Sequence, residues 1–184
     1  QDTMDQFAEL TGRAYKLFDY YGAEDAEKVI IIMGSGSGAV RETVDTLNHQ
    51  GQKTGALFVR LYRPFSVKHF LEHLPESVKK IAVLDRTLEH GAAAEPLYLD
   101  VVNAFAAADI GPEVIIGGIY GLSSKEFNPT MVNRIYEELD AENPKNRFTI
   151  GIEDDVTHTS LDYEGDFSVD KSTFNCKFYG LGSD

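Results

Sequence analysis

The sequence predicts an α/β fold: a three-layer α/β/α sandwich around a mostly parallel, five-stranded sheet. The first observation is the apolar run Val29-Ile30-Ile31-Ile32-Met33, which suits a strand buried on both faces of a parallel sheet. The second is that similar apolar runs alternate along the chain with segments of helical period. This alternation is typical of βαβ units, and it predicts right-handed crossovers.

A glycine-rich turn follows the first apolar run. Glycines at positions 34, 36 and 38 permit positive φ and close approach of the backbone, and Ser37 is a suitable cap for a helix. Val40, Val44 and Leu47 then recur at helical spacing, so one stripe of this helix faces the sheet. Residues 28–48 therefore open a βαβ unit around which the rest of the chain is organised.

The other elements follow the same alternation. Strands are expected over residues 29–33, 55–61, 80–84, 113–116 and 147–152, with a helix after each of the first four. Ser66 is placed as an N-cap, with Phe65 and Phe70 arranged as a hydrophobic staple around it. Asn128 and Pro129 are good N-cap and N1 residues for the last helix.

Four segments are expected along the chain. Residues 1–22 are predicted to carry a helix over 3–21, ended by Gly22, that belongs to the domain or to a preceding neighbour. Residues 23–152 form the α/β domain. Residues 153–173, where apolar residues thin out, are expected to be an extended interdomain arm, and 174–184 to open another domain. The missing initiator Met suggests a piece of a longer protein.

Composition narrows the possible partners. The net charge of −13 argues against nucleic acid and against anionic membranes. No apolar run approaches the roughly 20 residues that span a bilayer, and the start lacks the pattern of a signal peptide. The one cysteine, Cys176, excludes an internal disulfide and suits a reducing cytoplasm.

The glycine turn also fits a nucleotide-binding fingerprint. Gly34, Gly36 and Ala39 match G-x-G-x-x-A between a predicted strand and a predicted helix. Arg60 and Arg63 stand where an acidic residue would read the ribose of NAD, so an independent NADP-binding, Rossmann-like module is one hypothesis. The alternative is a glycine-rich turn that serves only the geometry of the fold.

Loops that follow parallel strands collect at one edge of the sheet. Here they would gather the 34–38 turn, Arg63, Asp85, Arg86, Tyr120, Asp154 and Asp155. This set contains no nucleophile–base pair, so we expect no catalytic residue and interpret the edge as solvated or as a docking surface for another domain. Asp154, Asp155 and His158 could bind a cation, but the histidines lack zinc-like spacing, so no metal site is predicted.

Several stretches together resemble one family, the pyruvate:ferredoxin (flavodoxin) oxidoreductases. They run in family order across nearly the whole chain: Leu17-Phe18-Asp19-Tyr20, Met33-Gly34-Ser35-Gly36, the 59–66 segment VRLYRPFS, Val83-Leu84-Asp85-Arg86-Thr87, the 95–101 segment EPLYLDV, the 120–127 segment YGLSSKEF, Pro144-Lys145-Asn146 and the 151–157 segment GIEDDVT. Leu88, His90 and Ile119 depart from the residues usual in the family.

The resemblance implies an internal piece of an enzyme that oxidatively decarboxylates pyruvate to acetyl-CoA and CO₂ and passes electrons to ferredoxin or flavodoxin. The cofactors that it implies for the parent enzyme are thiamine diphosphate, Mg²⁺, [4Fe-4S] clusters and coenzyme A. This piece is similar to the transketolase C-terminal domain, with other domains of the same polypeptide as its partners. The helix at 3–21 resembles the end of a thiamine-binding domain, and the parent is expected to be a cytoplasmic homodimer.

The resemblance also assigns the last residues of the chain. Residues 176–184 resemble the entrance to a coenzyme-A-associated domain, so Gly180, Gly182, Ser183 and Asp184 are the candidate cofactor-binding residues of a partial coenzyme A loop. No cofactor is expected to be held by this chain alone. Because the resembled domain does not bind nicotinamide, the 34–38 turn is interpreted as a fold-forming turn that faces a partner domain.

Overall fold

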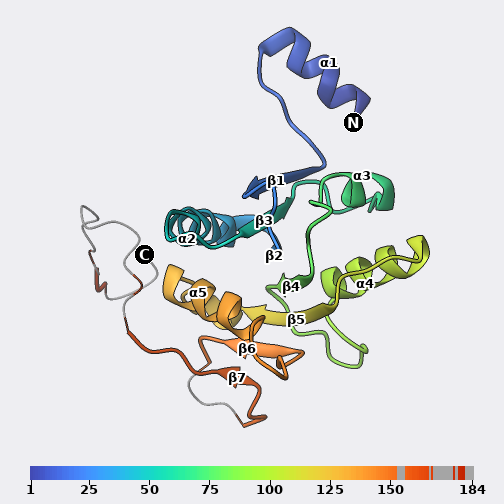
Figure 1. The fold of residues 1–184 in the computed structure, drawn as a ribbon. Helices are drawn as coiled ribbons and strands as arrows, with labels where there is room; N and C mark the ends of the chain where they lie inside the picture. Colours follow the sequence, from blue (N-terminus) through green and yellow to red (C-terminus); the bar gives the residue numbers. More distant parts are fainter. Residues whose placement is uncertain (153–155, 166, 168–175, 177, 181–184) are drawn as a thin grey trace.

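The computed structural model describes residues 1–152, 156–165, 167, 176 and 178–180, and its centre is a single mixed sheet (Figure 1). In sheet order the strands are β1-β3-β2-β4-β5-β6-β7, and all neighbouring pairs are parallel except β1 with β3. The strands are β1 (Phe18–Gly22), β2 (Lys28–Met33), β3 (Thr54–Val59), β4 (Lys80–Asp85), β5 (Val114–Tyr120), β6 (Phe148–Ile150) and β7 (Ser160–Leu161). The sheet thus has seven strands rather than the predicted five, because β1 and β7 add one at each edge.

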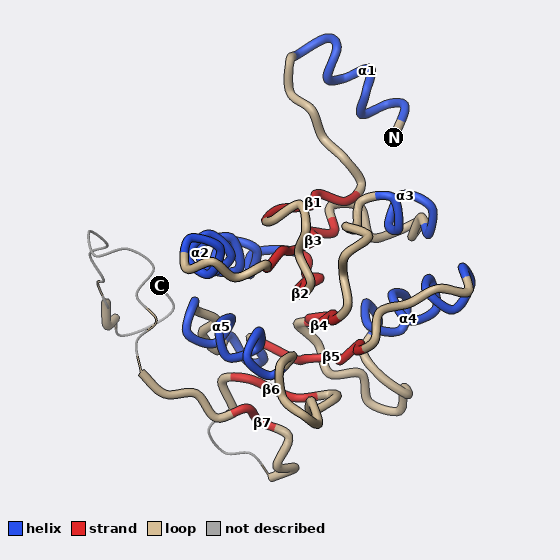
Figure 2. The backbone as a smooth tube through the Cα atoms, in the orientation of Figure 1, coloured by secondary structure: helices blue, strands red, loops and turns tan. Residues whose placement is uncertain are grey.

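Helices cover both faces of this sheet, as the fold class requires (Figures 1 and 2). The covering helices are α2 (Ser37–His49), α3 (Val67–Glu72), α4 (Pro96–Ala108) and α5 (Pro129–Glu138), and a further helix, α1 (Asp2–Thr11), precedes the sheet. One buried cluster joins α2 and α5 to one face of the strands, and a second joins α3 and α4 to the other face. Adjacent residues of β2 enter different clusters: Ile30 the first, Ile31 the second. The three-layer prediction is therefore confirmed.

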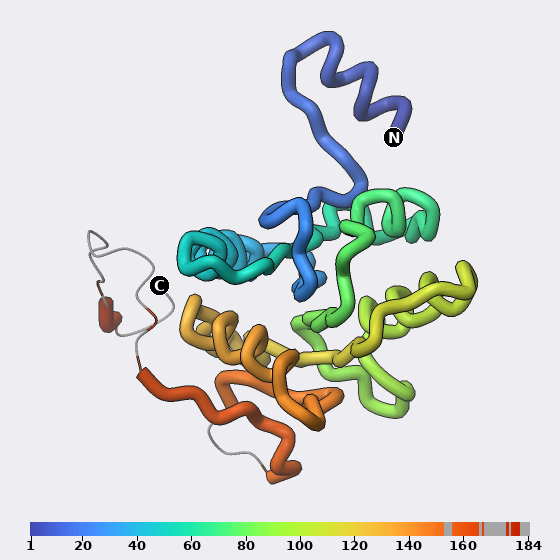
Figure 3. The backbone as a smooth tube through the Cα atoms, viewed as in Figure 1, coloured from blue at the N-terminus to red at the C-terminus, as the bar shows by residue number. Residues whose placement is uncertain are grey.

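The helix predicted over 3–21 is wrong in its second half. Helix α1 ends at Thr11, where Gly12 adopts a left-handed conformation with φ 72°. Residues 18–22 instead form β1, which pairs antiparallel with β3 from Phe18↔Val59 to Gly22↔Gly55. The strand is favoured over the helix because it buries Phe18, which lay outside the helical period, completely against Phe65 and Phe70. Helix α1 has no buried residue and projects away from the sheet (Figure 3).

The crossover between β5 and β6 departs from the predicted hand. From β2 to β3 the chain steps one strand toward the β1 edge of the sheet, and from β5 to β6 it steps one strand toward the β7 edge. The connecting helices, α2 and α5, nevertheless lie on the same face of the sheet. The two crossovers must therefore have opposite hands. The crossovers through α3 and α4 share the hand of the first, and because about 98% of such units are right-handed, β5–α5–β6 is left-handed. Its reversed hand gives each sheet face two covering helices.

The predicted caps are only partly confirmed. The Asn128 side chain accepts a hydrogen bond of 3.1 Å from the Met131 N–H, and Pro129 occupies the first helical position as expected. Ser37 does not cap α2, because a 3-10 turn, η1 (Gly34–Gly36), precedes the helix and makes Gly36 the N-cap. Ser66 is the N-cap of α3 but makes no capping bond, since its hydroxyl bonds His69 Nδ1 at 2.8 Å.

None of the helices in the described ranges combines the length and the apolar character needed to cross a membrane.

Candidate functional site

The strand order reverses between β2 and β4, because β2 leads toward one edge of the sheet and β4 toward the other. In open α/β sheets, ligands bind outside the carboxyl ends of the strands at such a reversal. The loops at this position are η1 after β2 and the Arg86 loop after β4, and the end of β5 lies beside them. The structure therefore brings together the 34–38 turn, Asp85, Arg86 and Tyr120, as the sequence predicted.

Tyr120 fills the space that the second glycine of the turn leaves open. A Cβ atom at Gly36 would lie 3.0 Å from Tyr120 Cε2 and 3.1 Å from the Tyr120 hydroxyl. That hydroxyl donates a hydrogen bond of 3.2 Å to the Met33 carbonyl, and the ring packs against Phe127 with 4.4 Å between centroids. Burial raises the pKa of the Tyr120 phenol, so it stays a neutral donor. The close approach at Gly36 is thus made by a side chain of this protein.

Arg86 is exposed and connects the turn after β2 with the loop after β5. Its Nε donates to the Gly121 carbonyl at 3.3 Å, and its Nη1 lies 3.5 Å from the Ser35 hydroxyl. Gly121 has φ 63°, and the next turn, η2 (Leu122–Ser124), places Ser123 and Ser124 at φ 53° and 58°. Two consecutive non-glycine residues in the left-handed region are strained, at a cost of order 1–3 kcal/mol each. This strained loop beside an exposed arginine is the most distinctive feature of the edge.

Asp85 serves the fold. Its two carboxylate oxygens accept from the N–H groups of Leu97 and Tyr98, at 3.0 and 3.1 Å, which caps the start of α4. Burial raises the pKa of Asp85, against the opposing effect of these two backbone donors. Asp85 is therefore held as a structural acceptor beneath the surface rather than presented to a ligand.

An ion pair beside Asp85, between a buried glutamate and a partly exposed arginine, is not evident from the sequence pattern. Glu95, which is 1% exposed, precedes α4, and its Oε1 accepts from Arg147 Nη2 at 3.2 Å. Glu95 Oε2 and Arg147 Nε are buried without a hydrogen-bond partner. The signal available in the sequence was a glutamate directly before Pro96 at a predicted helix start. Its partner could not be found, because Arg147 lies 52 positions later.

The two arginines of the NADP hypothesis are engaged with carboxylates of the protein. Arg60 Nε bonds Asp19 on β1 at 2.7 Å. Arg63 Nη2 bonds Asp100 on α4 at 2.7 Å, and its guanidinium lies over the Tyr62 ring, 3.8 Å from the centroid. Burial and the hydrogen bond to Asp100 raise the pKa of Tyr62 to about 12. These contacts of Arg63 are with α4 and with Tyr62, and none of them is with the glycine turn.

The remaining candidates give no site within the described residues. In those ranges, no group of three His, Cys, Asp or Glu side chains could hold a metal ion. Gly180 and Cys176 are exposed. Asp154, Asp155, Gly182, Ser183 and Asp184 lie outside the residues that the structure describes.

Comparison with known proteins gives the family. Residues 26–132 match the family described as pyruvate:ferredoxin oxidoreductase core domain II. The chain belongs to this family. The match begins just before β2 and ends within α5, so core domain II includes both loops of the strand-order reversal and the start of the last crossover.

Relatives of core domain II are found in long oxidoreductases. The chain is 56% identical over 183 residues to pyruvate:ferredoxin oxidoreductase of Moorella thermoacetica and 54% identical over 187 residues to pyruvate-flavodoxin oxidoreductase of Trichormus variabilis. These alignments cover 98% and 100% of the chain, but only 16% of each relative. A solved 2-oxoglutarate:ferredoxin oxidoreductase from Magnetococcus marinus, with 2-oxoglutarate, coenzyme A and succinyl-CoA bound, matches 73% of this chain and 21% of its own, at 27% identity and a TM-score of 0.48.

Proposed function

We propose that this chain is the core domain II portion of an enzyme that oxidatively decarboxylates pyruvate. In that reaction pyruvate and coenzyme A yield acetyl-CoA and CO₂, and two electrons pass to ferredoxin or flavodoxin. The observation that carries the proposal is the identity of 54–56% to such enzymes along essentially the whole chain. Relatives named for both acceptors align equally well, so both are kept.

Within that enzyme, the domain acts as a scaffold without an active site of its own. It lies between a thiamine-binding domain, to which α1 belongs, and a coenzyme-A-associated domain that opens at 174–184. Residues 18–22, which the sequence placed with the first segment, are strand β1 of the α/β domain itself. The scaffold role is supported by the reversal in strand order, where Tyr120 and Asp85 are committed to internal packing and capping. The exposed, strained Arg86–Ser124 edge is suited to contact another domain.

The parent enzyme would hold thiamine diphosphate, Mg²⁺, [4Fe-4S] clusters and coenzyme A in its other domains. The cysteine content supports this division for the iron–sulfur clusters, because the chain has one cysteine and a [4Fe-4S] cluster takes four. Gly180, Gly182, Ser183 and Asp184 would supply one side of the coenzyme A loop. The parent is proposed to be a cytoplasmic homodimer, with no nucleic-acid or membrane partner.

One experiment tests both statements. The full-length enzyme is expected to release ¹⁴CO₂ from [1-¹⁴C]pyruvate in the presence of thiamine diphosphate, Mg²⁺, coenzyme A and oxidised ferredoxin or flavodoxin. The 184-residue chain under the same conditions is expected to release none. Release by the 184-residue chain would overturn the scaffold role, and an inactive full-length enzyme would overturn the reaction.

The structure does not favour the alternative of an independent NADP-binding module. In the dinucleotide fingerprint the second glycine lets the backbone approach the pyrophosphate. Here Gly36 is explained by the Tyr120 ring, and Arg60 is paired with Asp19. Titration calorimetry of the chain with millimolar NADPH is expected to show no binding heat beyond dilution, and a saturable isotherm would restore the alternative.

A further inference from the structure

Backbone carbonyls of the segment after β6 accept hydrogen bonds from α5 and from the loop that follows α5. Arg134 Nε donates to the Asp162 carbonyl at 3.0 Å, and Lys145 Nζ lies 3.1 Å from the Ser160 carbonyl and 3.4 Å from the His158 carbonyl. These two cations thus bind carbonyls before, within and after β7. Hydrogen bonds from charged donors are about twice as strong as neutral ones. Because the acceptors are carbonyls, the contacts do not depend on the side chains of the segment.

Glu138 holds the guanidinium of Arg134 and the backbone of Lys145. Its Oε2 accepts from Arg134 Nη2 at 2.6 Å, and its Oε1 accepts from the backbone N–H of Lys145, also at 2.6 Å. The Glu138 side chain is only 7% exposed. A carboxylate in the last turn of a helix is opposed by the helix dipole, and its burial adds a further cost. Both costs are offset by its two short hydrogen bonds, so the position of Glu138 is explained by the residues that it orients.

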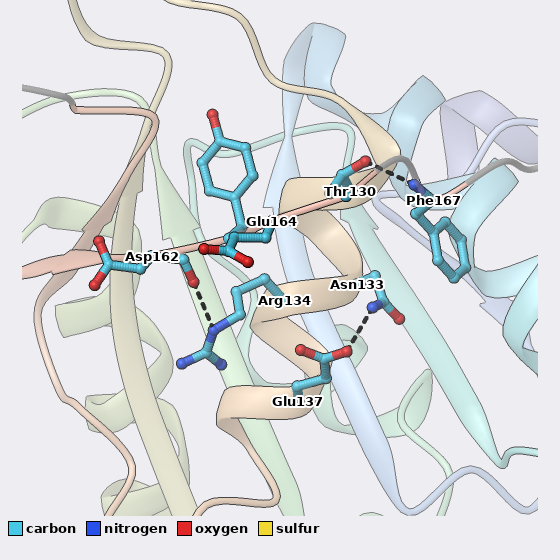
Figure 4. A pocket seen from close by; sticks show the side chains of 9 residues that line it. Thr130, Asn133, Arg134, Glu137, Asp162, Glu164 and Phe167 are labelled. Carbon is cyan, nitrogen blue, oxygen red and sulfur yellow. Dashed lines mark hydrogen bonds between the residues drawn. The ribbon is translucent and has the colours of Figure 1, made fainter.

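The attachment of this segment to the domain is partly open to solvent. A cavity of about 440 Å³, polar in its lining, separates the segment from α5 (Figure 4). Figure 4 shows Arg134 reaching from α5 to the Asp162 carbonyl, and Thr130 accepting from the Phe167 N–H at 3.0 Å. On its other side, the segment pairs with β6, where the Thr159 carbonyl accepts from the Thr149 N–H at 3.1 Å. Arg134 and Lys145 therefore supply charged contacts in a partly hydrated attachment.

We propose that Arg134, Glu138 and Lys145 form a clip that fixes the direction in which the chain leaves the α/β domain after β7. The clip also occupies carbonyls at the outer edge strand of the sheet, where unpaired backbone groups would otherwise be open to another chain. The idea that the clip positions the next domain rests on the proposed function. The contacts of the clip with residues 156–165 do not depend on that function.

The grip is tested with endoproteinase Glu-C, which can cut after Glu164 in the clipped segment. In the 184-residue chain, Arg134→Ala is expected to speed cleavage at Glu164 about tenfold, because it removes the charged hydrogen bond to the Asp162 carbonyl. Glu138→Gln is expected to act in the same direction, because it removes the charge that holds the Arg134 guanidinium in place. Lys68→Ala is the matched control: it breaks the exposed i,i+4 pair between Lys68 and Glu72 on α3, far from the segment in sequence. Equal cleavage rates in the wild type, the Arg134→Ala variant and the control would overturn the clip.

The positioning role is tested in the full-length enzyme with the same three variants. If the clip aims the chain at the coenzyme-A-associated domain, Arg134→Ala is expected to raise KM for coenzyme A several-fold while KM for pyruvate and the yield of the thiamine-dependent half-reaction stay unchanged. Faster cleavage without a change in KM for coenzyme A would overturn the positioning role alone. An inactive wild-type enzyme would instead count against the proposed function, so the two failures are distinguishable. Arg134→Ala keeps the test valid if the buried Glu138→Gln variant fails to fold.

Discussion

Replacing Gly36 by alanine separates a packing role for the glycine turn from a ligand-binding role. Gly36 has φ −62°, so alanine adds no backbone strain there. The new Cβ would lie 2.8 Å from Ile32 Cδ1 and 3.0 Å from Tyr120 Cε2. The isoleucine methyl can rotate away, but the Tyr120 ring is 3% exposed and anchored by its bond to the Met33 carbonyl. Overpacking of this kind destabilises by about 1–3 kcal/mol.

Gly38 is the matched control, since it lies two residues later, inside α2, and a Cβ added there would meet no atom within 4 Å. Gly38→Ala is expected to stabilise the protein by about 0.5–1 kcal/mol through helix propensity. Thermal unfolding followed by circular dichroism should therefore show Tm falling by roughly 2–12 °C for Gly36→Ala and rising for Gly38→Ala, at about 2–4 °C per kcal/mol. Equal shifts for the two variants would refute the packing explanation, as would a Gly36→Ala cost that persists unchanged in a Tyr120→Leu background.

Three further predictions follow from particular contacts. Asn128→Ala should cost about 1 kcal/mol in urea denaturation because it removes the cap on α5, whereas Ser66→Ala should lose no capping energy; equal costs would contradict this. Glu95→Ala should cost about 2 kcal/mol, less than for a fully buried pair, because Arg147 is 41% exposed and can hydrate; a neutral variant would show that the pair is dispensable. Partial burial of Asp140 tends to raise its pKa, but hydrogen bonds from Lys28 and Lys80 outweigh this effect and lower the pKa from 3.8. The ionised Asp140 therefore stabilises the fold above pH 3.8, and this stabilisation is lost as the pH falls through the lower pKa of the folded state. Asp140→Asn should flatten that acid limb of the stability profile, and an unchanged slope would rule the contribution out.

Local pattern was sufficient for the elements whose partners are close in sequence. The β2–η1–α2 unit, the cap at Asn128 and both core faces of β2 could be predicted because apolar period and turn chemistry act over a few residues. Strand β5 was predicted too short, ending at Ile116, because Gly117 and Gly118 look like a loop. Both glycines lie in the strand, since they admit the rings of Tyr98 and Phe148. Those rings come from other elements, which local pattern does not reveal.

The N-terminal error has the same origin. Phe7, Leu10, Ala14, Leu17 and Tyr21 keep a helical spacing, and the sequence offers no proline to interrupt it before Gly22. The pairing of residues 18–22 with β3 decides the outcome, because it buries Phe18 completely and places the Tyr20 ring over Gly55, which has no side chain. A strand that pairs with a partner more than 30 residues later competes successfully with a local helix only through such tertiary contacts.

The left-handed crossover connects these observations to the clip. Because α5 returns on the face of α2, its C-terminal end reaches the starts of β2 and β4, where Asp140 accepts from Lys28 at 2.6 Å and from Lys80 at 3.2 Å. This bridge fixes the end of α5 against the two central strands, and Glu138, two residues earlier, is fixed with it. A right-handed connection would place α5 on the opposite face and separate Glu138 from this anchor. The departure from the usual hand therefore brings the residues that hold the exiting chain next to the Asp140 bridge, and Asp140→Asn combined with Arg134→Ala should speed Glu-C cleavage at Glu164 more than either change alone.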